Sequence, residues 1–167
     1  IMDYGIPGSP EGHINGVDIE MEKITQKFEH HRDIAFLPNF KTFDIEQRFV
    51  KYEHQEYETK KTFAAVDLGQ QILSLQGKLT GEDRVLGSLV QYRKFIAGGF
   101  YWTPDTDEIN ISIFGFREKE FNFITVQASS RLEFLTIKPE TTTLSSVNID
   151  QDQIKERNFY YGSYALS

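Results

Sequence analysis

The stretch that decides the expected fold covers residues 62–99 and reads TFAAVDLGQQILSLQGKLTGEDRVLGSLVQYRKFIAGG. Apolar residues recur in its first half at the three- and four-residue intervals of an amphipathic helix. They are Ala64, Ala65, Leu68, Ile72 and Leu75. Thr62 can cap this helix at its start, and Gly77 can end it. The spacing therefore predicts a helix over about residues 62–76.

A second helix is expected over about residues 81–97. The segment Thr80-Gly81-Glu82-Asp83 is similar to a capping box, whose hydroxyl and carboxylate groups satisfy early backbone N–H groups. The apolar face that follows consists of Val85, Leu86, Leu89, Val90, Tyr92 and Ile96. Gly98-Gly99 would end the helix. Two helices joined by about three residues lie antiparallel, so the sequence predicts a helical hairpin.

Downstream, the period of the apolar residues changes from 3.6 to 2, which indicates strands. Three hairpin-linked strands are predicted at 109–113, 121–126 and 132–137, and a fourth strand is expected at 100–103. The aromatic tail at 159–166 is expected to be extended and to close an edge of the sheet. Upstream, residues 17–28 carry apolar residues at helical spacing, which predicts a short helix. A short strand is expected at 33–37, and residues 43–58 favour extended structure.

Together these patterns predict an α+β fold, in which a two-helix hairpin covers one face of an antiparallel sheet. Glycine and proline residues break any regular pattern in residues 1–16, which are expected to form an extended N-terminal arm. Residues 17–167 are expected to form a single α+β domain. The length of 167 residues agrees with one domain of ordinary size.

Composition restricts the function classes. Hydrophobic residues make up 39% of the chain and charged residues 26%, which is typical of a globular domain. No apolar run approaches the length of a membrane-spanning helix, and the first residues do not resemble a signal peptide. The absence of cysteine excludes disulfides, thiol catalysis and cysteine-ligated metal sites.

The net charge is −7, but basic residues gather between residues 60 and 97. The candidate residues for binding a membrane or a nucleocapsid are Lys60, Lys61, Lys78, Arg84, Arg93 and Lys94. A basic helical face of this kind attracts anionic lipid headgroups or the phosphates of a nucleoprotein. The alternative interpretation is an ordinary solvated face of a helix.

No motif in the sequence indicates catalysis or a cofactor. His30, His31 and His54 lack the spacing of metal ligands, so no metal site is expected. Gly98-Gly99 precedes an aromatic segment rather than a helix, and no nucleophile elbow is present. We therefore expect no catalytic residue, no cofactor and no enzymatic activity, although a pair among the 25 acidic residues could escape notice.

The segment Thr80-Gly81-Glu82-Asp83-Arg84-Val85-Leu86-Gly87-Ser88-Leu89-Val90 resembles the opening of the second helix in some matrix proteins of rhabdoviruses. The order of aromatic strand, two helices and antiparallel sheet is similar over residues 45–138. Two features depart from that family: residues 1–20 are acidic rather than basic, and the Pro-Pro-x-Tyr budding signal is missing.

The resemblance implies a viral matrix-type structural protein that self-assembles and links the nucleocapsid to the membrane. Its implied partners are further copies of itself, the viral nucleocapsid and an anionic membrane surface, without sequence-specific nucleic-acid binding. Its implied locations are the virion, the host cytoplasm and the inner face of membranes.

Two other hypotheses belong to different classes. The first is a non-enzymatic β-rich assembly or ligand-binding module, such as a phage particle component, with Tyr101, Trp102 and Tyr160 on its contact surface. The second is a hydrolase. Self-association would separate the matrix hypothesis from the hydrolase, and binding to anionic liposomes would separate it from the binding module.

Overall fold

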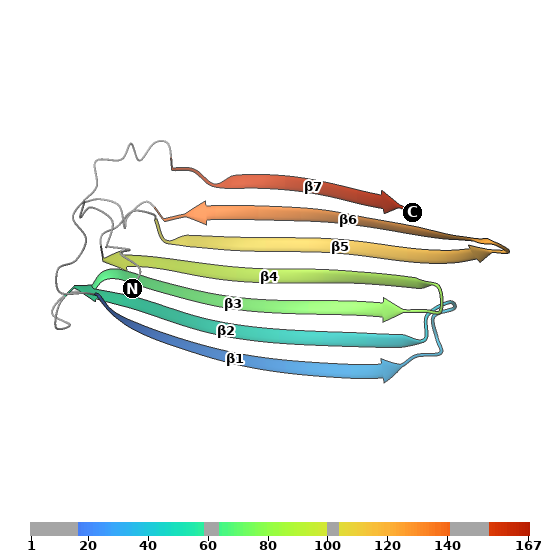
Figure 1. Ribbon diagram of the computed structural model, residues 1–167, viewed down its shortest axis with the longest axis horizontal. Coiled ribbons are helices and arrows are strands. Elements are labelled where there is room, and N and C mark those ends of the chain that lie inside the picture. Colours follow the sequence, from blue (N-terminus) through green and yellow to red (C-terminus); the bar gives the residue numbers. More distant parts are fainter. Residues whose placement is uncertain (1–16, 59–63, 100–103, 141–153) are drawn as a thin grey trace.

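The computed structural model describes residues 17–58, 64–99, 104–140 and 154–167, and every regular element in these residues is a β-strand. The strands are β1 (Val17–Asp33), β2 (Thr42–Glu58), β3 (Ala64–Thr80), β4 (Arg84–Gly99), β5 (Thr106–Phe121), β6 (Ile124–Pro139) and β7 (Arg157–Leu166). They form one sheet in the order of the sequence, with antiparallel neighbours throughout (Figure 1).

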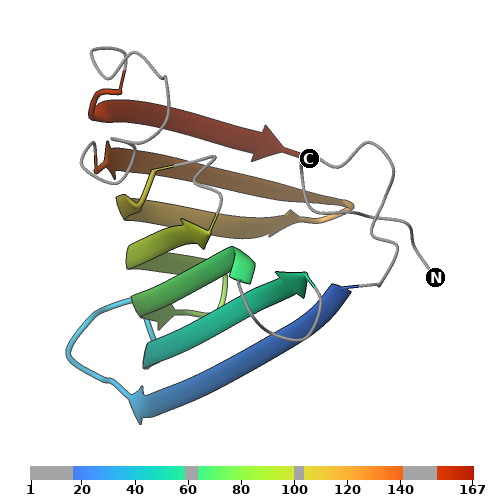
Figure 2. The same cartoon turned by 90° about the vertical axis from the view of Figure 1, so that its left-hand side faces the viewer.

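The sheet is long, twisted and curved across its strands (Figure 2). Six of the strands are 16 or 17 residues long, and β7 has 10 residues. The connections 34–41, 81–83 and 122–123 all lie at one end of the sheet, where β5 and β6 extend furthest (Figure 1). Both β1 and β7 are edge strands.

The two faces of the sheet differ in exposure. On β5, Ile109, Ile111 and Ile113 are 43–53% exposed, whereas Ser112, on the opposite face, is only 1% exposed. Side chains crowd together on the concave side of a curved sheet, so we assign the more covered set to that side. We call the concave side the inner face and the convex side, which carries the three isoleucines, the outer face.

Few of the described residues are buried, because these residues form a single sheet without a second layer of their own. Val66 is 5% exposed and Ala97 is 1% exposed, and these two are the buried hydrophobic residues among those described. Many large apolar side chains remain accessible, including Leu75 at 52% and Leu132 at 60%. The described part of the chain therefore has an apolar surface rather than a closed apolar core.

The prediction of an α+β fold with a helical hairpin is wrong, since residues 64–80 and 84–99 form β3 and β4 of an all-β sheet. These strands carry apolar residues on both faces. Leu68 and Ile72 lie on the inner face of β3, while Leu73 and Leu75 lie on its outer face. When the apolar residues of both faces are taken together, they recur at intervals of three and four residues, as they do in a helix.

The predicted capping box is instead the turn between β3 and β4. The backbone N–H of Gly81 donates to the carbonyl oxygen of Arg84 at 2.8 Å, which closes the turn. A Cβ atom at position 81 would lie 2.1 Å from the carbonyl oxygen of Asn39 in the neighbouring connection. Glycine is thus required at this position by a close approach of two backbone segments.

Other predictions agree with the structure in part. The extended segment 43–58 is confirmed as β2, and the tail 159–166 is confirmed as part of an edge strand. Residues 109–137 are extended as expected, but they form two strands rather than three, with the turn at Asn122, whose φ is 43°. The helix predicted at 17–28 is wrong because these residues belong to β1.

The strand predicted at 33–37 is also wrong, since residues 34–41 connect β1 and β2. The expected N-terminal arm, residues 1–16, and the expected strand at 100–103 lie outside the described residues. The single-domain assignment for residues 17–167 stays a prediction, although the class assigned to it changes from α+β to all-β.

Gly87 provides a test of the sheet packing. A Cβ atom there would lie 2.3 Å from Cζ of Phe114, the cross-strand partner of Gly87. We expect Gly87→Ala to lower the free energy of unfolding by about 1–3 kcal/mol, because the phenyl ring must move off the strand. Chemical denaturation followed by circular dichroism measures the change.

Gly115→Ala is the matched control on the neighbouring strand. The nearest atom to its new Cβ would be the Val85 carbonyl oxygen, at an ordinary 3.9 Å. We expect this variant to be as stable as the parent or more stable by up to about 1 kcal/mol. Equal destabilisation of both variants would contradict the register of β4 and β5.

Candidate functional site

The structure separates the basic residues that the sequence analysis grouped together. Lys60 and Lys61 lie outside the described residues. Lys78 and Arg93 are on the inner face, whereas Arg84 and Lys94 are on the outer face. Neighbouring residues on a strand point to opposite faces, so Arg93 and Lys94 cannot form one stripe.

Each of the four described basic residues is close to a carboxylate. The separations are 3.5 Å from Lys78 Nζ to Asp44 Oδ2, 2.6 Å from Arg84 Nε to Asp83 Oδ1, 2.9 Å from Arg93 Nε to Glu108 Oε2 and 3.8 Å from Lys94 Nζ to Glu140 Oε1. These pairs reduce the positive field of the segment. Binding of an anionic partner by these residues stays a prediction.

The outer face contains a band without charged residues that crosses β2 to β7. We call it the outer band, and it consists of every second residue in the ranges 43–49, 73–79, 86–92, 109–115, 130–136 and 158–164. None of these positions holds Asp, Glu, Lys, Arg or His, although 26% of the chain is charged. Most of them hold Leu, Ile, Val, Phe or Tyr.

Charged residues border the outer band at both ends of the strands. On β5 the bordering residues are Asp107 and Arg117, and on β4 they are Lys94 and Arg84. Each pair is ten residues apart, which is about 33 Å along a strand. This length is comparable with the hydrocarbon thickness of a lipid bilayer, about 30 Å.

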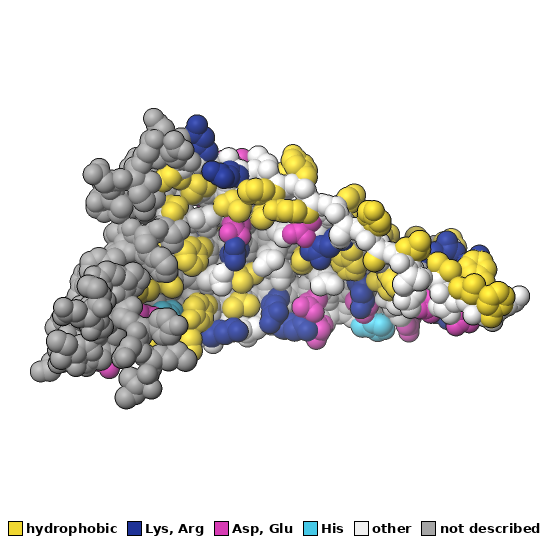
Figure 3. Space-filling view, turned by 45° about the horizontal axis from the view of Figure 1, so that its top comes forward, with side chains coloured by type: hydrophobic (Ala, Val, Ile, Leu, Met, Phe, Trp, Pro, Cys, Tyr) yellow, Lys and Arg dark blue, Asp and Glu magenta, His cyan; other side chains and the backbone are white. Residues whose placement is uncertain are grey.

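Apolar side chains are also visible along the β6–β7 side of the sheet and at the narrow end where the β5–β6 turn projects (Figure 3). Tyr160 is 79% exposed, Tyr164 is 90% exposed, and Phe123 in the turn is 89% exposed. Groups of exposed apolar side chains are typical of contact sites.

The inner face has the opposite character at its centre. Arg93 donates to Glu108, and Asn110 Nδ2 donates to Glu133 Oε1 at 2.8 Å. Arg131 Nε donates to the other oxygen of Glu133 at 2.9 Å. The hydrogen bonds from Asn110 and Arg131 lower the pKa of the Glu133 carboxyl. Polar groups are therefore paired with each other across β4, β5 and β6.

One hollow of about 250 Å³ lies on this part of the inner face. It is lined by Gln91, Arg93, Glu108, Asn110 and Leu135. The Oδ1 atom of Asn110 and the Oγ atom of Ser112 are buried and make no hydrogen bond with the described residues. Such atoms are uncommon in folded proteins, since a buried acceptor without a partner is costly.

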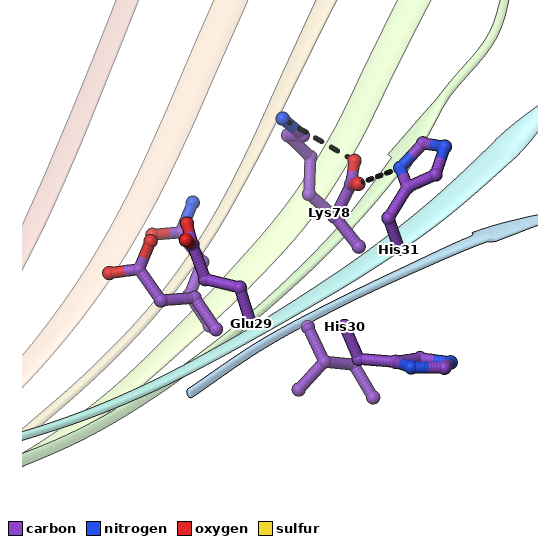
Figure 4. A pocket seen from close by; sticks show the side chains of 8 residues that line it. Glu29, His30, His31 and Lys78 are labelled. Carbon is purple, nitrogen blue, oxygen red and sulfur yellow. Dashed lines mark hydrogen bonds and ion pairs between the residues drawn. The ribbon is translucent and has the colours of Figure 1, made fainter. Parts of the chain in front are cut away.

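A second hollow, of about 320 Å³, lies near the β1 edge and is lined by residues of β1, β2 and β3. His31 Nδ1 lies 2.5 Å from Asp44 Oδ1, and Lys78 approaches the other oxygen of the same carboxylate (Figure 4). The hydrogen bond with His31 and the charge of Lys78 lower the pKa of Asp44. His30 lies on the other side of β1 (Figure 4).

Neither hollow offers a metal site. Across residues 17–58, 64–99, 104–140 and 154–167, no group of three or more His, Asp or Glu side chains is arranged to hold a metal ion. The same residues contain no helix with the length and apolar character needed to cross a membrane.

Neither the outer band nor the polar cluster at the centre of the inner face was predicted from the sequence. The available signal was alternation: in β5 the residues Glu108, Asn110 and Ser112 alternate with three isoleucines. The same alternation is blurred in β3 and β4, where apolar residues occupy both faces at some positions. Only the register between strands brings the uncharged positions into one band.

Acidification should destabilise the fold through paired carboxylates. The hydrogen bond from Arg84 lowers the pKa of Asp83 from 3.8 to about 2. Because the unfolded carboxyl binds a proton first as the pH falls, the stabilisation is complete above about pH 4 and is lost toward pH 2. We expect Asp83→Asn to be less stable than the parent at pH 6, with the difference vanishing near pH 2.

Urea denaturation at pH 6, 4 and 2 measures this effect. Glu120→Gln, at the exposed end of β5, is the matched control and should leave the difference between pH 6 and pH 2 nearly unchanged. A pH dependence of Asp83→Asn identical to that of the parent would show that the contact between Asp83 and Arg84 does not persist in solution.

Comparison with known proteins gives no relative. No family model matches the chain, and no curated protein or solved structure matches it significantly.

Proposed function

We propose that this chain is a non-enzymatic structural module that contacts lipid hydrocarbon through the outer band, while its inner face stays in water. One observation carries the proposal: the outer band on the exposed convex face is mostly apolar and carries no charge across six strands, and the centre of the covered concave face holds hydrogen-bonded polar residues. A sheet exposed to water on its outer face usually has the reverse distribution.

The convex shape favours lipid over a second copy as the occupant of the outer band. Two convex surfaces touch over a limited area, whereas a stable protein interface buries about 800 Å² on each partner. Acyl chains conform to a curved surface and can cover the whole band. Burial of the outer band in hydrocarbon thus removes more apolar area from water than a contact between copies does.

Residues at the ends of the outer band support the same proposal. Tyr92 lies at one end of the band, and its hydroxyl donates to Asp107 in the bordering charged row at 2.7 Å. Tyr164 lies in the row at the other end. Tyrosine is enriched where hydrocarbon meets the polar headgroups, because its ring is apolar and its hydroxyl is polar.

Lipid contact places one requirement on the sheet edges. Backbone N–H and C=O groups on an edge strand are costly in hydrocarbon when they have no partner. The outer edge of β7 must therefore pair with a further strand when the outer band is in lipid. On β1 the outer positions Asp18, Glu20 and Glu22 are acidic, so the start of that strand lies outside the apolar surface.

The matrix-type hypothesis loses part of its support in this structure. The segment 80–90 that carries the resemblance forms a turn and a strand, and the helical hairpin of the expected order is replaced by β3 and β4. A membrane partner retains support from the outer band. The nucleocapsid partner and the virion location remain hypotheses without a structural argument, and the chain fits the alternative of a β-rich assembly module better.

Flotation with neutral phosphatidylcholine vesicles and with anionic vesicles tests the proposal. Contact through the outer band predicts binding to both vesicle types, and this binding should persist in 1 M salt because it is hydrophobic. Contact through the basic residues predicts binding to anionic vesicles only, with a steep loss as salt rises. Binding that follows the second pattern would overturn the proposal.

A charge placed in the middle of the outer band should abolish lipid binding. Ile111 is 43% exposed and has an uncharged neighbour on each adjacent strand. We expect Ile111→Lys to weaken vesicle binding at least thirtyfold, since a lysine in hydrocarbon costs about 2–4 kcal/mol. Because the position is accessible, the fold should tolerate the change.

Thr125→Lys is the matched control, because it adds the same charge at an exposed position on the inner face of β6. It should bind vesicles like the parent. Equal binding of Ile111→Lys and Thr125→Lys would overturn the proposal. The parent chain could instead fail to bind vesicles and form a dimer that Ile111→Lys disrupts. That result would show that the outer band contacts a second copy of the chain and would overturn the proposal.

A further inference from the structure

The free edge of β7 has no partner strand among the described residues (Figure 1). Gln127 and Ser167 exchange two backbone hydrogen bonds, of 2.9 and 3.0 Å, so they form a hydrogen-bonded pair at the end of the ladder between β6 and β7. Such pairs occur at every second residue of an antiparallel ladder, so the odd-numbered residues of β7 bond to β6. The N–H and C=O groups of the even-numbered residues therefore point toward the free edge. These exposed residues are Asn158, Tyr160, Gly162, Tyr164 and Leu166.

β7 lacks the features that keep a sheet edge from pairing with other strands. Such edges are usually protected by charged side chains, by proline or by a bulge. Residues 158–167 contain no charged residue and no proline, and the register between β6 and β7 is regular. Tyr160 and Tyr164 are 79% and 90% exposed, so their rings are accessible along this edge. The edge is therefore suited to pair with a further uncharged strand.

The sequence of β7 is complementary to a second copy of itself about a two-fold axis at Gly162. In an antiparallel pairing about this axis, Tyr160 of one copy lies opposite Tyr164 of the other, and all five even-numbered residues take part. Gly162 faces itself at the axis and has no side chain to clash there. The ring of Tyr160 already packs against Phe134 of β6, with centroids 5.0 Å apart. Tyr164 of the second copy would continue this row of aromatic side chains.

The side chains that this pairing brings together on the inner face differ in size. Phe159 lies opposite Ala165 of the second copy, and Tyr161 lies opposite Ser163. A large side chain therefore meets a small one at each of these positions. No two like charges are placed opposite each other, because residues 158–167 are uncharged. The β7 edge is thus compatible with its own copy on both faces.

β1 is less suited to the same role. A two-fold pairing of β1 about its middle residue, Thr25, places Lys23 opposite Lys27 of the second copy. Like charges directly opposite each other destabilise a sheet. β1 and β7 run in the same direction, so a sheet continued from β7 into β1 of another copy would contain a parallel pair. A parallel pair is slightly less stable per residue than an antiparallel one.

We propose that two copies of this chain pair antiparallel through β7, about a two-fold axis at Gly162, and form one continuous sheet. Each of the five pairs of even-numbered residues exchanges two backbone hydrogen bonds. The pairing supplies the further strand that lipid contact requires, but it rests on the β7 edge alone and occurs in water as well. One pair of strands makes a small interface, so we expect a dissociation constant on the order of 10 µM.

Analytical ultracentrifugation of the full chain without lipid, from about 1 to about 300 µM, tests the proposal. We expect an equilibrium between monomer and dimer, with no larger species. A chain that stays monomeric over the whole range would overturn the proposal. Growth into polymers would also overturn it, because an edge that pairs with β1 of the next copy leaves another edge free at each end.

Opposite charges at position 162 locate the axis. We expect Gly162→Asp and Gly162→Lys each to weaken the dimer at least thirtyfold, because each new charge faces its own copy across the axis. A mixture of the two variant chains should form a dimer again, since an acid then faces a base. The new Cβ atom would lie 3.5 Å from Cδ2 of Leu132, an ordinary contact, so both variants should fold. An unchanged dimer in either variant, or a mixture that stays monomeric, would overturn the proposal.

Gln26→Asp is the matched control, because it adds the same charge at an exposed position near the middle of the outer face of β1. It should dimerise like the parent, and loss of the dimer in this variant would contradict pairing through β7. Ile111→Lys should also dimerise like the parent in the absence of lipid. A chain that dimerises through β7 but does not bind vesicles would reject the lipid proposal alone. A monomeric chain that binds vesicles would reject the pairing alone.

Discussion

The curvature of one unpartnered sheet determines the rest of the structure. Seven antiparallel strands satisfy one another's backbone hydrogen bonds, and the described residues contain no second layer. Curvature crowds the side chains of the concave face and spreads those of the convex face. Ser112 is consequently 1% exposed, while its neighbour Ile113 is 53% exposed.

Polar residues gather on the more covered face of the sheet, and apolar residues are exposed on the other face. The crowded inner face holds Arg93, Glu108, Asn110 and Glu133, which satisfy most of their hydrogen bonds mutually. Burial of polar groups is tolerated only when such bonds form. The outer face exposes isoleucines and leucines, such as Ile113 and Leu75, of the kind that fill the core of an ordinary sandwich. The proposed hydrocarbon partner would therefore remove this apolar surface from water.

The same division between the faces fits the proposed lipid contact. With hydrocarbon on the outer side and water on the inner side, the exposed apolar residues leave water while the polar residues of the inner face stay hydrated. The paired charges of Arg93 with Glu108 and of Arg131 with Glu133 satisfy one another at the centre of the inner face.

Sequence reasoning succeeded where one face of a strand dominates the pattern. In β5, alternation of isoleucine with polar residues predicted extended structure correctly, although the turn at Asn122 was missed. In β3 and β4 both faces carry apolar residues, and their superposition imitated helical spacing. Gly69 and Gly87 spoke against the two helices, since a glycine in a helix interior costs about 1 kcal/mol. The outer band depends on register between strands, which single-strand patterns do not contain.

The central claim is that the two faces meet different solvents, and cysteine scanning along β5 tests it most directly. The chain has no native cysteine, so single cysteines at positions 108–113 each carry one spin label without further changes. In vesicles, the account predicts labels at 109, 111 and 113 in contact with lipid-soluble oxygen and labels at 108, 110 and 112 in contact with a water-soluble relaxant. Equal exposure of all six labels to water would contradict the account.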